Sequence, residues 1–137
     1  MRGTDQFIGR LNSLSQAIRD ELKEEIEATA TDIEIGAIRM APTSIGQKIQ
    51  KVAAEGGLVQ RISVNAGAIG AYTEFGTGQS AAALVPTLPD EWQSVARQFF
   101  INGQGKLRSA PYLYPNWVRY TTGLKDRLKL ILDRAVR

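Results

Sequence analysis

Glu74 has the most conspicuous surroundings of any acidic residue, because no other Asp or Glu lies between Glu55 and Asp90. Tyr72 stands two positions before it, so a strand would present a carboxylate and a phenol on one face. Acid–base catalysis by a carboxylate needs a second acid, a base or a metal ion close by. The sequence places no such group beside Glu74, and we expect an ion pair or a subunit contact there.

Two further groups of residues could do chemistry but lack a decisive partner. Gly76-Thr77-Gly78 resembles part of a phosphate-binding loop, yet no lysine follows it and no helix is predicted to start there. Ser13 and Ser15 could be paired with Lys48 or Lys51, but nothing in the spacing enforces their proximity. Neither group predicts a nucleophile or an anion site.

Neither cysteine nor histidine occurs among the 137 residues. Their absence removes disulfides, thiolate nucleophiles, the commonest zinc ligands and the side chain best suited to proton transfer near neutral pH. An enzyme or a metal site would have to rely on carboxylates, lysine and tyrosine. We therefore predict that the protein is not an enzyme, binds no cofactor or metal, and has no small-molecule substrate.

Length and hydropathy predict a single domain over residues 1–137. A chain of this size can bury a modest core. No apolar run approaches the roughly 20 residues that span a bilayer, and the N-terminus lacks the pattern of a signal peptide. We expect no membrane partner and folding in a cytoplasm.

Charge is unevenly distributed along the chain. Residues 1–40 carry five Lys and Arg against eight Asp and Glu, a net charge of −3, and residues 41–137 carry twelve against six, a net charge of +6. This asymmetry could join one end of a molecule to the opposite end of its neighbour, or reflect two ordinary solvated surfaces.

A basic nucleic-acid-binding module is an alternative of another class. Three aromatic residues near three basic residues could stack on single-stranded nucleic acid; they are Tyr112, Tyr114 and Trp117 with Lys106, Arg108 and Arg119. Aromatic residues between two prolines are more often packing anchors, and no cluster of five basic residues occurs.

The elements that position these residues begin with a long helix. Apolar residues recur in steps of three and four from Phe7 to Met40, with Thr4 or Asp5 as its cap, and the Ala41-Pro42 step ends it. The helix is continuous or breaks near residues 29–31. Its acidic middle, residues 20–27, is either a solvated face or a docking face for a basic neighbour.

Three short strands are predicted next, over residues 48–53, 58–65 and 69–75. Glu55-Gly56-Gly57 supplies the turn between the first two, and the three would form an antiparallel meander. Residues 76–86 lack charge and periodicity, so we expect a long flexible loop there.

The C-terminal part is predicted to be helical on either side of a second loop. Thr87-Leu88-Pro89-Asp90 opens a short helix with Thr87 as its cap, residues 101–110 form the loop, and Pro115 starts the last helix. The predicted fold is α+β: a long N-terminal helix, a meander of three or four strands, a short middle helix, and a C-terminal helix packed on the sheet.

The order of these pieces resembles the tail-completion, or neck, proteins of long-tailed bacteriophages, also described as minor tail or head-tail joining proteins. Three stretches carry the resemblance. Residues 39–46 close a long helix with an Ala-Pro step and a glycine, residues 71–78 contain a tyrosine followed by Glu-Phe-Gly-Thr, and residues 110–115 read Ala-Pro-Tyr-Leu-Tyr-Pro. The sequence departs from the family pattern at residues 43–46 and at Asn116-Trp117, where a small residue is common.

The resemblance implies a structural virion protein of the phage neck, assembled in the host cytoplasm. It would join or complete the tail as a ring of its own copies, a hexamer, in contact with neighbouring neck and tail proteins and close to DNA in the channel. A tail terminator or other tube-capping protein is the alternative. The implied subunit or partner interface consists of Tyr72, Glu74, Phe75, Gly76, Thr77 and Gly78. The implied structural motif consists of Pro42, Gly46, Pro111, Tyr112, Leu113 and Pro115, which would pack the last helix onto the sheet.

Overall fold

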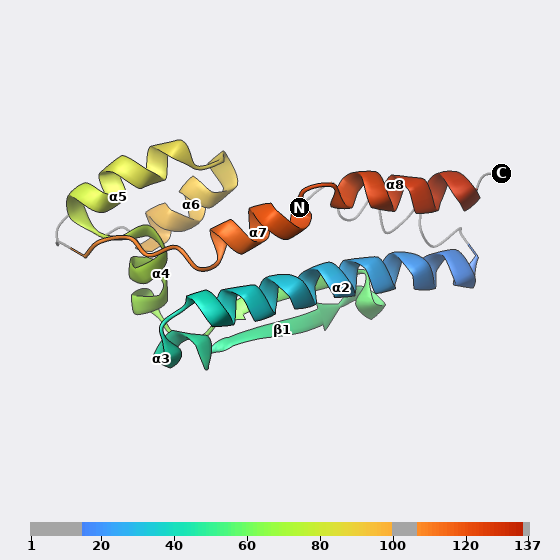
Figure 1. The fold of residues 1–137 in the computed structure, drawn as a ribbon, viewed down its shortest axis with the longest axis horizontal. Coiled ribbons are helices and arrows are strands. Elements are labelled where there is room, and N and C mark those ends of the chain that lie inside the picture. The colour runs from blue at the N-terminus through green and yellow to red at the C-terminus, as the bar shows by residue number, and fades with distance from the viewer. Residues whose placement is uncertain (1–14, 100–106, 136–137) are drawn as a thin grey trace.

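A long helix and a β-hairpin run side by side through the protein (Figure 1). The computed structural model describes residues 15–99 and 107–135. Helix α2 (Gln16–Met40) is the longest element, and strands β1 (Ile49–Ala54) and β2 (Val59–Val64) form the hairpin. The fold class is α+β, as predicted.

Helix α2 is continuous over its 25 residues, so the alternative of a break near residues 29–31 is wrong. The Ser15 hydroxyl caps its start by accepting the Ile18 N–H at 3.4 Å. It ends where predicted, because Ala41 before Pro42 is extended with ψ 151°. The predicted start at Phe7 and the caps Thr4 and Asp5 lie outside the described residues. No helix in the described part of the chain is both long and apolar enough to cross a membrane.

The hairpin confirms the first two predicted strands to within a residue. Its antiparallel register pairs Ile49 with Val64 and Ala54 with Val59. A short 3-10 turn, η1 (Glu55–Gly57), joins the strands, and both of its glycines have positive φ. The α3 turn (Thr43–Gly46) links the hairpin to α2.

The predicted third strand is wrong, because residues Ala68–Phe75 form helix α4. Gly67 and Gly76, with φ of 62° and 77°, bound the helix at its two ends. The alternation of Tyr72 and Glu74 with their neighbours favours a strand, but helical spacing brings Gly70 and Glu74 onto one buried face. Tertiary burial overrides the local pattern, and the sheet among the described residues has two strands.

The predicted loop at 76–86 is also wrong. Helix α5 (Gly78–Leu84) and the 3-10 turn η2 (Val85–Thr87) occupy it. Alanine has the highest helix propensity of any residue. Three consecutive alanines in this segment outweigh the lack of an apolar pattern. Helix α6 (Asp90–Phe99) follows as predicted, although the Thr87 hydroxyl donates to the Leu84 carbonyl instead of capping it.

The C-terminal helix is interrupted. Helix α7 (Tyr114–Thr121) and helix α8 (Leu124–Ala135) are separated at Gly123, whose φ is +82°. Both pack mainly along α2 (Figure 1), and the contact with the hairpin is made by Tyr112 and Leu113 at the start of α7. Of the second predicted loop, residues 107–110 have no regular structure and residues 101–106 lie outside the description.

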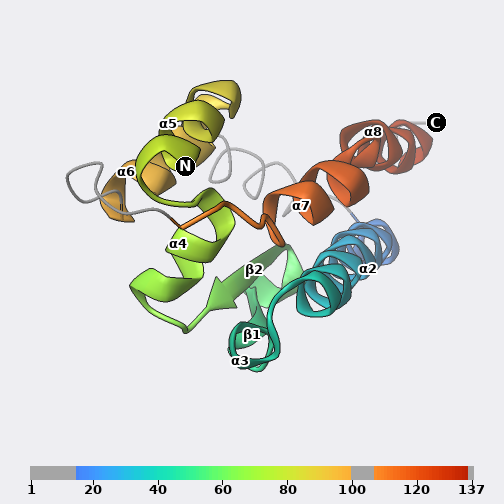
Figure 2. The same cartoon turned by 60° about the vertical axis from the view of Figure 1, so that its left-hand side comes forward.

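The described residues form three apolar core clusters. Figure 2 shows α4, α5 and α6 grouped on one side of the molecule and α2 with α8 on the other. One cluster lies between α2 and α8, one between α2, the hairpin and the segment before α7, and one under α4 and α6. Their buried members are Leu22, Leu58 and Ile131; Ala37, Ile45, Ile49 and Tyr112; and Phe75, Leu88 and Ala96.

Candidate functional site

The Glu74 carboxylate binds three consecutive backbone N–H groups. Glu74 lies on α4 and is only 3% exposed. Its Oε2 accepts the N–H groups of Tyr112 and Leu113, and its Oε1 accepts that of Tyr114, each at 2.8 Å. A charged acceptor strengthens such bonds, so the carboxylate ties α4 to the start of α7.

This arrangement provides the cap that α7 lacks locally. The first N–H groups of a helix have no partner within the helix, and Leu113 at the capping position offers no side-chain acceptor. Pro115 lies in the first turn of α7 and has no N–H to satisfy. Glu74 therefore supplies from another helix an acceptor for the first N–H of α7, that of Tyr114, and for the two N–H groups just before the helix.

Burial dominates the protonation of the two acidic groups at this junction. Desolvation raises the pKa of Glu74, and the three N–H donors oppose the rise. Burial, and then the neighbouring Glu74 charge, raises the pKa of Tyr112 to about 12. The Tyr112 hydroxyl therefore stays protonated and acts as a hydrogen-bond donor.

Tyr112 fastens the same junction in the opposite direction. Its hydroxyl donates to the Gly70 carbonyl at 2.8 Å, one turn of α4 before Glu74. A Cβ on Gly70 would lie 3.3 Å from that hydroxyl, so the missing side chain gives the tyrosine its room. The ring, 2% exposed, belongs to the cluster that contains Ile45 and Ile49. The three stretches that carry the family resemblance thus meet at Tyr112.

Residues 107–110 are fastened along α4 and the start of α5. Thr77 N–H donates to the Leu107 carbonyl, and Leu107 N–H donates to the Thr77 hydroxyl, both at 2.9 Å. Ser109 N–H donates to the Ser80 hydroxyl at 2.9 Å, and Ala110 N–H donates to the Thr73 carbonyl at 2.8 Å. The segment before α7 is therefore held along its length by the 73–80 region.

Gly76 is required at the centre of this region for two reasons. Its φ of +77° is unfavourable for residues with a side chain. A Cβ there would also lie 2.7 Å from the Ser80 hydroxyl and 2.8 Å from the Ser109 nitrogen. The backbone of the 107–110 segment can approach only because position 76 carries no side chain.

Asn116 lies where α7 crosses α2. It is 5% exposed, and its amide donates to the Tyr112 carbonyl at 2.6 Å and to the Met40 sulfur at 3.1 Å. A Cβ on Gly36 of α2 would overlap the Asn116 amide. The small residue at this helix crossing is therefore Gly36 of α2.

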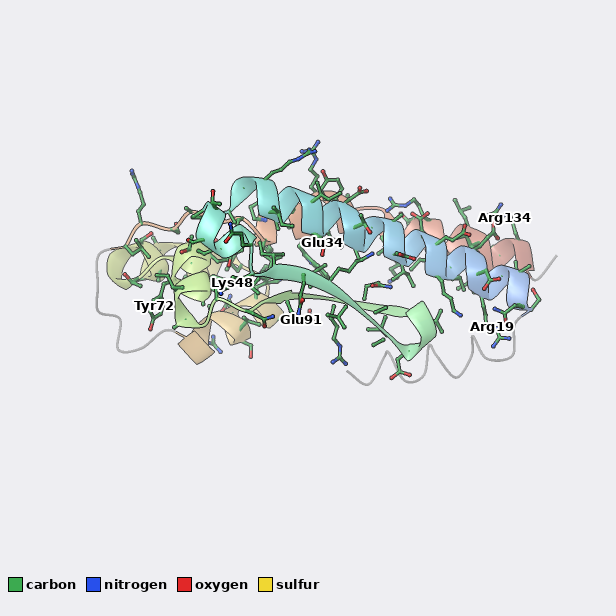
Figure 3. The ribbon with its side chains drawn as sticks, turned by 90° about the horizontal axis from the view of Figure 1, so that it is seen from below. Arg19, Glu34, Lys48, Tyr72, Glu91 and Arg134 are labelled. Atoms are coloured by element: carbon green, nitrogen blue, oxygen red, sulfur yellow. The ribbon has the colours of Figure 1, made fainter. Side chains whose placement is uncertain are left out.

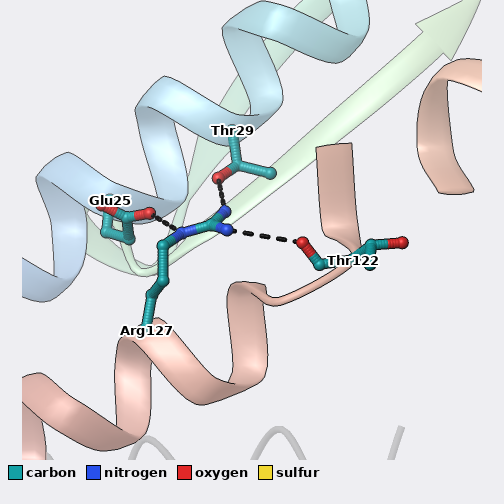
Figure 4. Close-up of polar contacts among 4 residues, drawn as sticks. All are labelled: Glu25, Thr29, Thr122 and Arg127. Atoms are coloured by element: carbon teal, nitrogen blue, oxygen red, sulfur yellow. Dashed lines mark hydrogen bonds and ion pairs between the residues drawn. The ribbon is translucent and has the colours of Figure 1, made fainter. Parts of the chain in front are cut away.

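Ion pairs join the acidic α2 to the chain's own basic C-terminal half (Figure 4). The Arg127 guanidinium of α8 contacts Glu25 and the Thr29 hydroxyl of α2, and it donates to the Thr122 carbonyl at 3.4 Å. A second pair joins Arg134 and Glu21 at 3.5 Å. Part of the charge asymmetry in the sequence is therefore used within the molecule.

The predicted interface residues divide into an inner and an outer set. Glu74, Phe75 and Gly76 are buried and contact other parts of this chain. Tyr72 and Thr77 are half-buried, and Gly78 begins α5. An intermolecular role stays a prediction for this segment, and Tyr72 and Thr77 are the residues in it that a partner could reach.

The structural motif residues lie at two places, the start of α7 and the α3 turn. Tyr112 and Leu113 pack in the cluster that contains Ile49, Ile62 and Val64 of the hairpin. Pro111 precedes them, and Pro115 follows in the first turn of α7. Pro42 precedes the α3 turn, and Gly46 closes it, where a Cβ would lie 3.2 Å from the Ile38 carbonyl.

A groove of about 180 Å³ opens beside this junction, and its lining is mainly apolar. Its titratable lining residues are Glu74 and Tyr112, whose polar side-chain atoms already make the hydrogen bonds described above. Across residues 15–99 and 107–135, no group of three or more acidic, His or Cys side chains could hold a metal ion. The arrangement suits a fixed structural joint.

Sequence reasoning missed the link between Glu74 and residues 112–114. Two signals pointed to helix α4: Gly67 and Gly76 flank an eight-residue segment, and Gly70 and Glu74 are four positions apart. No sequence signal pairs Glu74 with a backbone 38 residues away. That pairing requires the tertiary structure.

Comparison with known proteins gives one family. Residues 5–85 match a family model described as "Bacteriophage HK97-gp10, putative tail-component". The matched region covers more than half of the chain, and it includes α2, the hairpin, α4 and residues 71–78. No curated protein and no solved structure matches the chain.

Proposed function

Because the chain belongs to the HK97-gp10-like family of bacteriophage tail components, we propose that it completes the tail at the head-tail junction through ring-forming contacts between its copies. As a tail component it has a structural role in the virion and interacts with other tail proteins. The proposal adds the position in the neck, the ring of six copies and closeness to DNA in the channel.

The observation that carries the proposal is the Glu74 junction. It fixes the family's signature segment to residues 107–114, and so presents the outer face of α4 on a firm support. Ile69 on that face is 55% exposed, and Tyr72 lies one turn further on. Leu107, 44% exposed, adds a third apolar side chain near Thr77.

The proposed contact between neighbouring copies consists of Ile69 and Tyr72 on α4 together with Leu107, which lies beside Thr77 just after this helix. A closed ring needs heterologous contacts, in which a surface of one copy meets a different surface of the next. Exposed apolar and aromatic residues contribute much of the free energy at such contacts. Glu74, Phe75 and Gly76 would act indirectly by holding α4 in place.

The experiment is complementation of a phage that lacks this gene. Wild-type protein should restore the joining of tails to heads, and the variant Ile69→Ala with Tyr72→Ala should not. Leu130→Ala is the matched control, because Leu130 is exposed on α8, away from the α4 face. Sedimentation of the purified chain, alone and with tail tubes, measures its assembly directly. A wild-type chain that stays monomeric and does not bind tubes would overturn the proposal.

The phage that lacks this gene also distinguishes the tail-terminator alternative from the proposed completion role. A terminator stops growth of the tube, so phage without it should make tubes of irregular, excessive length. A completion protein acts after growth, so phage without it should make tubes of normal length that do not join heads. Electron microscopy of the deletion lysate distinguishes the two.

The nucleic-acid alternative loses part of its basis. Tyr112 is buried, so it cannot stack on a base. Trp117 is 43% exposed, so this part of the alternative is not removed. Lys106 lies outside the described residues. Binding to phosphates would weaken steeply as salt rises, so filter binding of DNA at two salt concentrations tests this alternative separately.

A further inference from the structure

The outer edge of β1 has hydrogen-bonding groups that no described residue uses. Asn65 N–H donates to the Lys48 carbonyl at 2.9 Å, and these residues stand opposite each other in the antiparallel register. Hydrogen-bonded pairs alternate with non-hydrogen-bonded ones along such a ladder. The N–H and carbonyl groups of Ile49, Lys51 and Ala53 therefore point outward, and nothing among the described residues pairs with them.

A mainly acidic flank of α2 runs beside this edge. Glu27, Thr31, Glu34 and Ile38 follow one another at steps of four, three and four, so they share one side of the helix. Lys51 of β1 reaches Thr31 at 2.9 Å and Glu27 at 3.4 Å, which places this flank over β1. Figure 3 labels Glu34 on the same stretch of α2. The Glu27 side chain is 62% exposed, and Glu34 is half-buried.

We propose that β1 accepts an extended segment of another tail component as a third strand, with a lysine or arginine of that segment facing Glu27 and Glu34. Main-chain hydrogen bonds would supply part of the affinity, and charge complementarity would select the sequence. Lys51 is the one cation paired with this flank among the described residues, so the flank keeps a negative excess. The inference rests on the proposed function only for the source of the strand.

Two pairings with a second copy are less favourable. A β1–β1 pair would set the acidic flank against itself, which places like charges side by side. A β1–β2 pair would place neighbouring hairpins about 10 Å apart, since strands are spaced by about 4.8 Å. Packed helices are separated by about 8–10 Å. The contacts of Arg127 and Asn116 with α2 place α8 and α7 on the side of α2 away from Glu27 and Glu34. A neighbour's α2 would have to fit into this same occupied space.

A heptapeptide of alternating valine and lysine is the probe for this edge. In a hydrogen-bonded pair, opposite residues share a face, and Lys51 faces α2. In a peptide strand antiparallel to β1, the lysines therefore face α2 and also direct their backbone N–H groups at β1. Titration into the isotope-labelled full chain should shift the amide signals of Ile49, Lys51 and Ala53 at millimolar peptide.

N-methylation of the peptide provides a matched pair of controls. Methyl groups on the backbone nitrogens of the peptide's lysines block the edge and should abolish the shifts. Methyl groups on the backbone nitrogens of the peptide's valines point away from β1 and should leave the shifts in place. A heptapeptide of alternating valine and glutamate should not bind. Binding that ignores the position of the methyl groups, or an absence of shifts with the lysine peptide, would overturn the proposal.

Two protein variants test the same surface. Glu27→Lys with Glu34→Lys reverses the flank and should weaken the lysine peptide roughly three- to tenfold, the scale of two exposed ion pairs. Asp32→Lys changes an exposed residue one position after Thr31, on another side of α2, and should leave the affinity unchanged. Equal affinities for all three proteins would exclude the acidic flank. Sedimentation measures ring formation and not peptide binding, so the two proposals succeed or fail separately. Dimerisation through β1 without the peptide would favour a second copy of this chain as the occupant instead.

Discussion

The Glu74 carboxylate accepts the backbone N–H of Tyr112, and Tyr112 in turn donates its hydroxyl to Gly70, one turn before Glu74. The two residues are 38 positions apart, and both are almost completely buried. Their reciprocal bonds connect the signature segment of a phage tail protein to the start of α7.

Glu74→Gln should destabilise the protein by about 1–3 kcal/mol, because the amide NH₂ of glutamine would face a backbone N–H that needs an acceptor. Glu74→Ala should cost more, since it leaves three N–H groups without their acceptor. Urea denaturation gives the free energy of unfolding of each variant. Glu24→Gln removes an exposed charge from α2 and serves as the control. Equal stabilities of Glu74→Gln and the control would contradict the role of the carboxylate.

The contribution of Glu74 should decrease as pH rises. Burial raises its pKa in the native state above the ordinary value of 4.5, so the native protein holds this proton more tightly than the unfolded chain does. The free energy of unfolding then falls as pH rises from about 4.5 through the native pKa. Glu74→Gln lacks this titration, so the stability difference between wild type and variant should shrink over that interval. Denaturation curves at several pH values measure it, and a difference that grows with pH would refute the direction.

Tyr112→Phe should cost about 1–2 kcal/mol, because it removes a buried hydrogen bond and leaves the Gly70 carbonyl without that partner. The aromatic ring remains, so the packing against Ile45 and Ile49 is unchanged. Tyr120→Phe is the matched control, since the Tyr120 hydroxyl makes no hydrogen bond within the described residues. Thermal unfolding of the two variants compares them, and similar melting temperatures would count against the bond.

Gly36→Ala should destabilise the protein by about 1–3 kcal/mol although alanine favours helices, because its methyl group would overlap Asn116. In an Asn116→Ala background the same change should become neutral or stabilising. A double-mutant cycle measures this coupling. Additive effects of the two substitutions would show that the α2–α7 crossing does not depend on their contact.

Apolar packing should hold α8 on α2 more strongly than the ion pairs do. Leu22 is fully buried against Ile131, so Leu22→Ala should cost about 2–5 kcal/mol. The Arg127 side chain is 44% exposed, and Arg127→Gln should cost less than about 1 kcal/mol, decreasing with added salt. Urea denaturation at low and high salt separates the two effects. A larger loss for Arg127→Gln would reverse this order.

The elements predicted correctly are those whose signals are local. The end of α2 follows from Pro42, and the hairpin follows from alternating residues around Gly56 and Gly57. The elements predicted wrongly are short and ambiguous. Residues 69–75 alternate like a strand but form α4, because the groups that must be buried, Gly70 and Glu74, are spaced for a helix.

The sequence by itself determined the long helix, the hairpin, the absence of cysteine and histidine chemistry, and the resemblance to phage tail proteins. These depend on residue types and short spacings. Only the tertiary structure decided the partner of Glu74, the interruption between α7 and α8, and the fit of Asn116 against Gly36. A buried carboxylate must find donors wherever the chain brings them, and at Glu74 those donors are backbone N–H groups, which every residue except proline possesses and no sequence pattern marks.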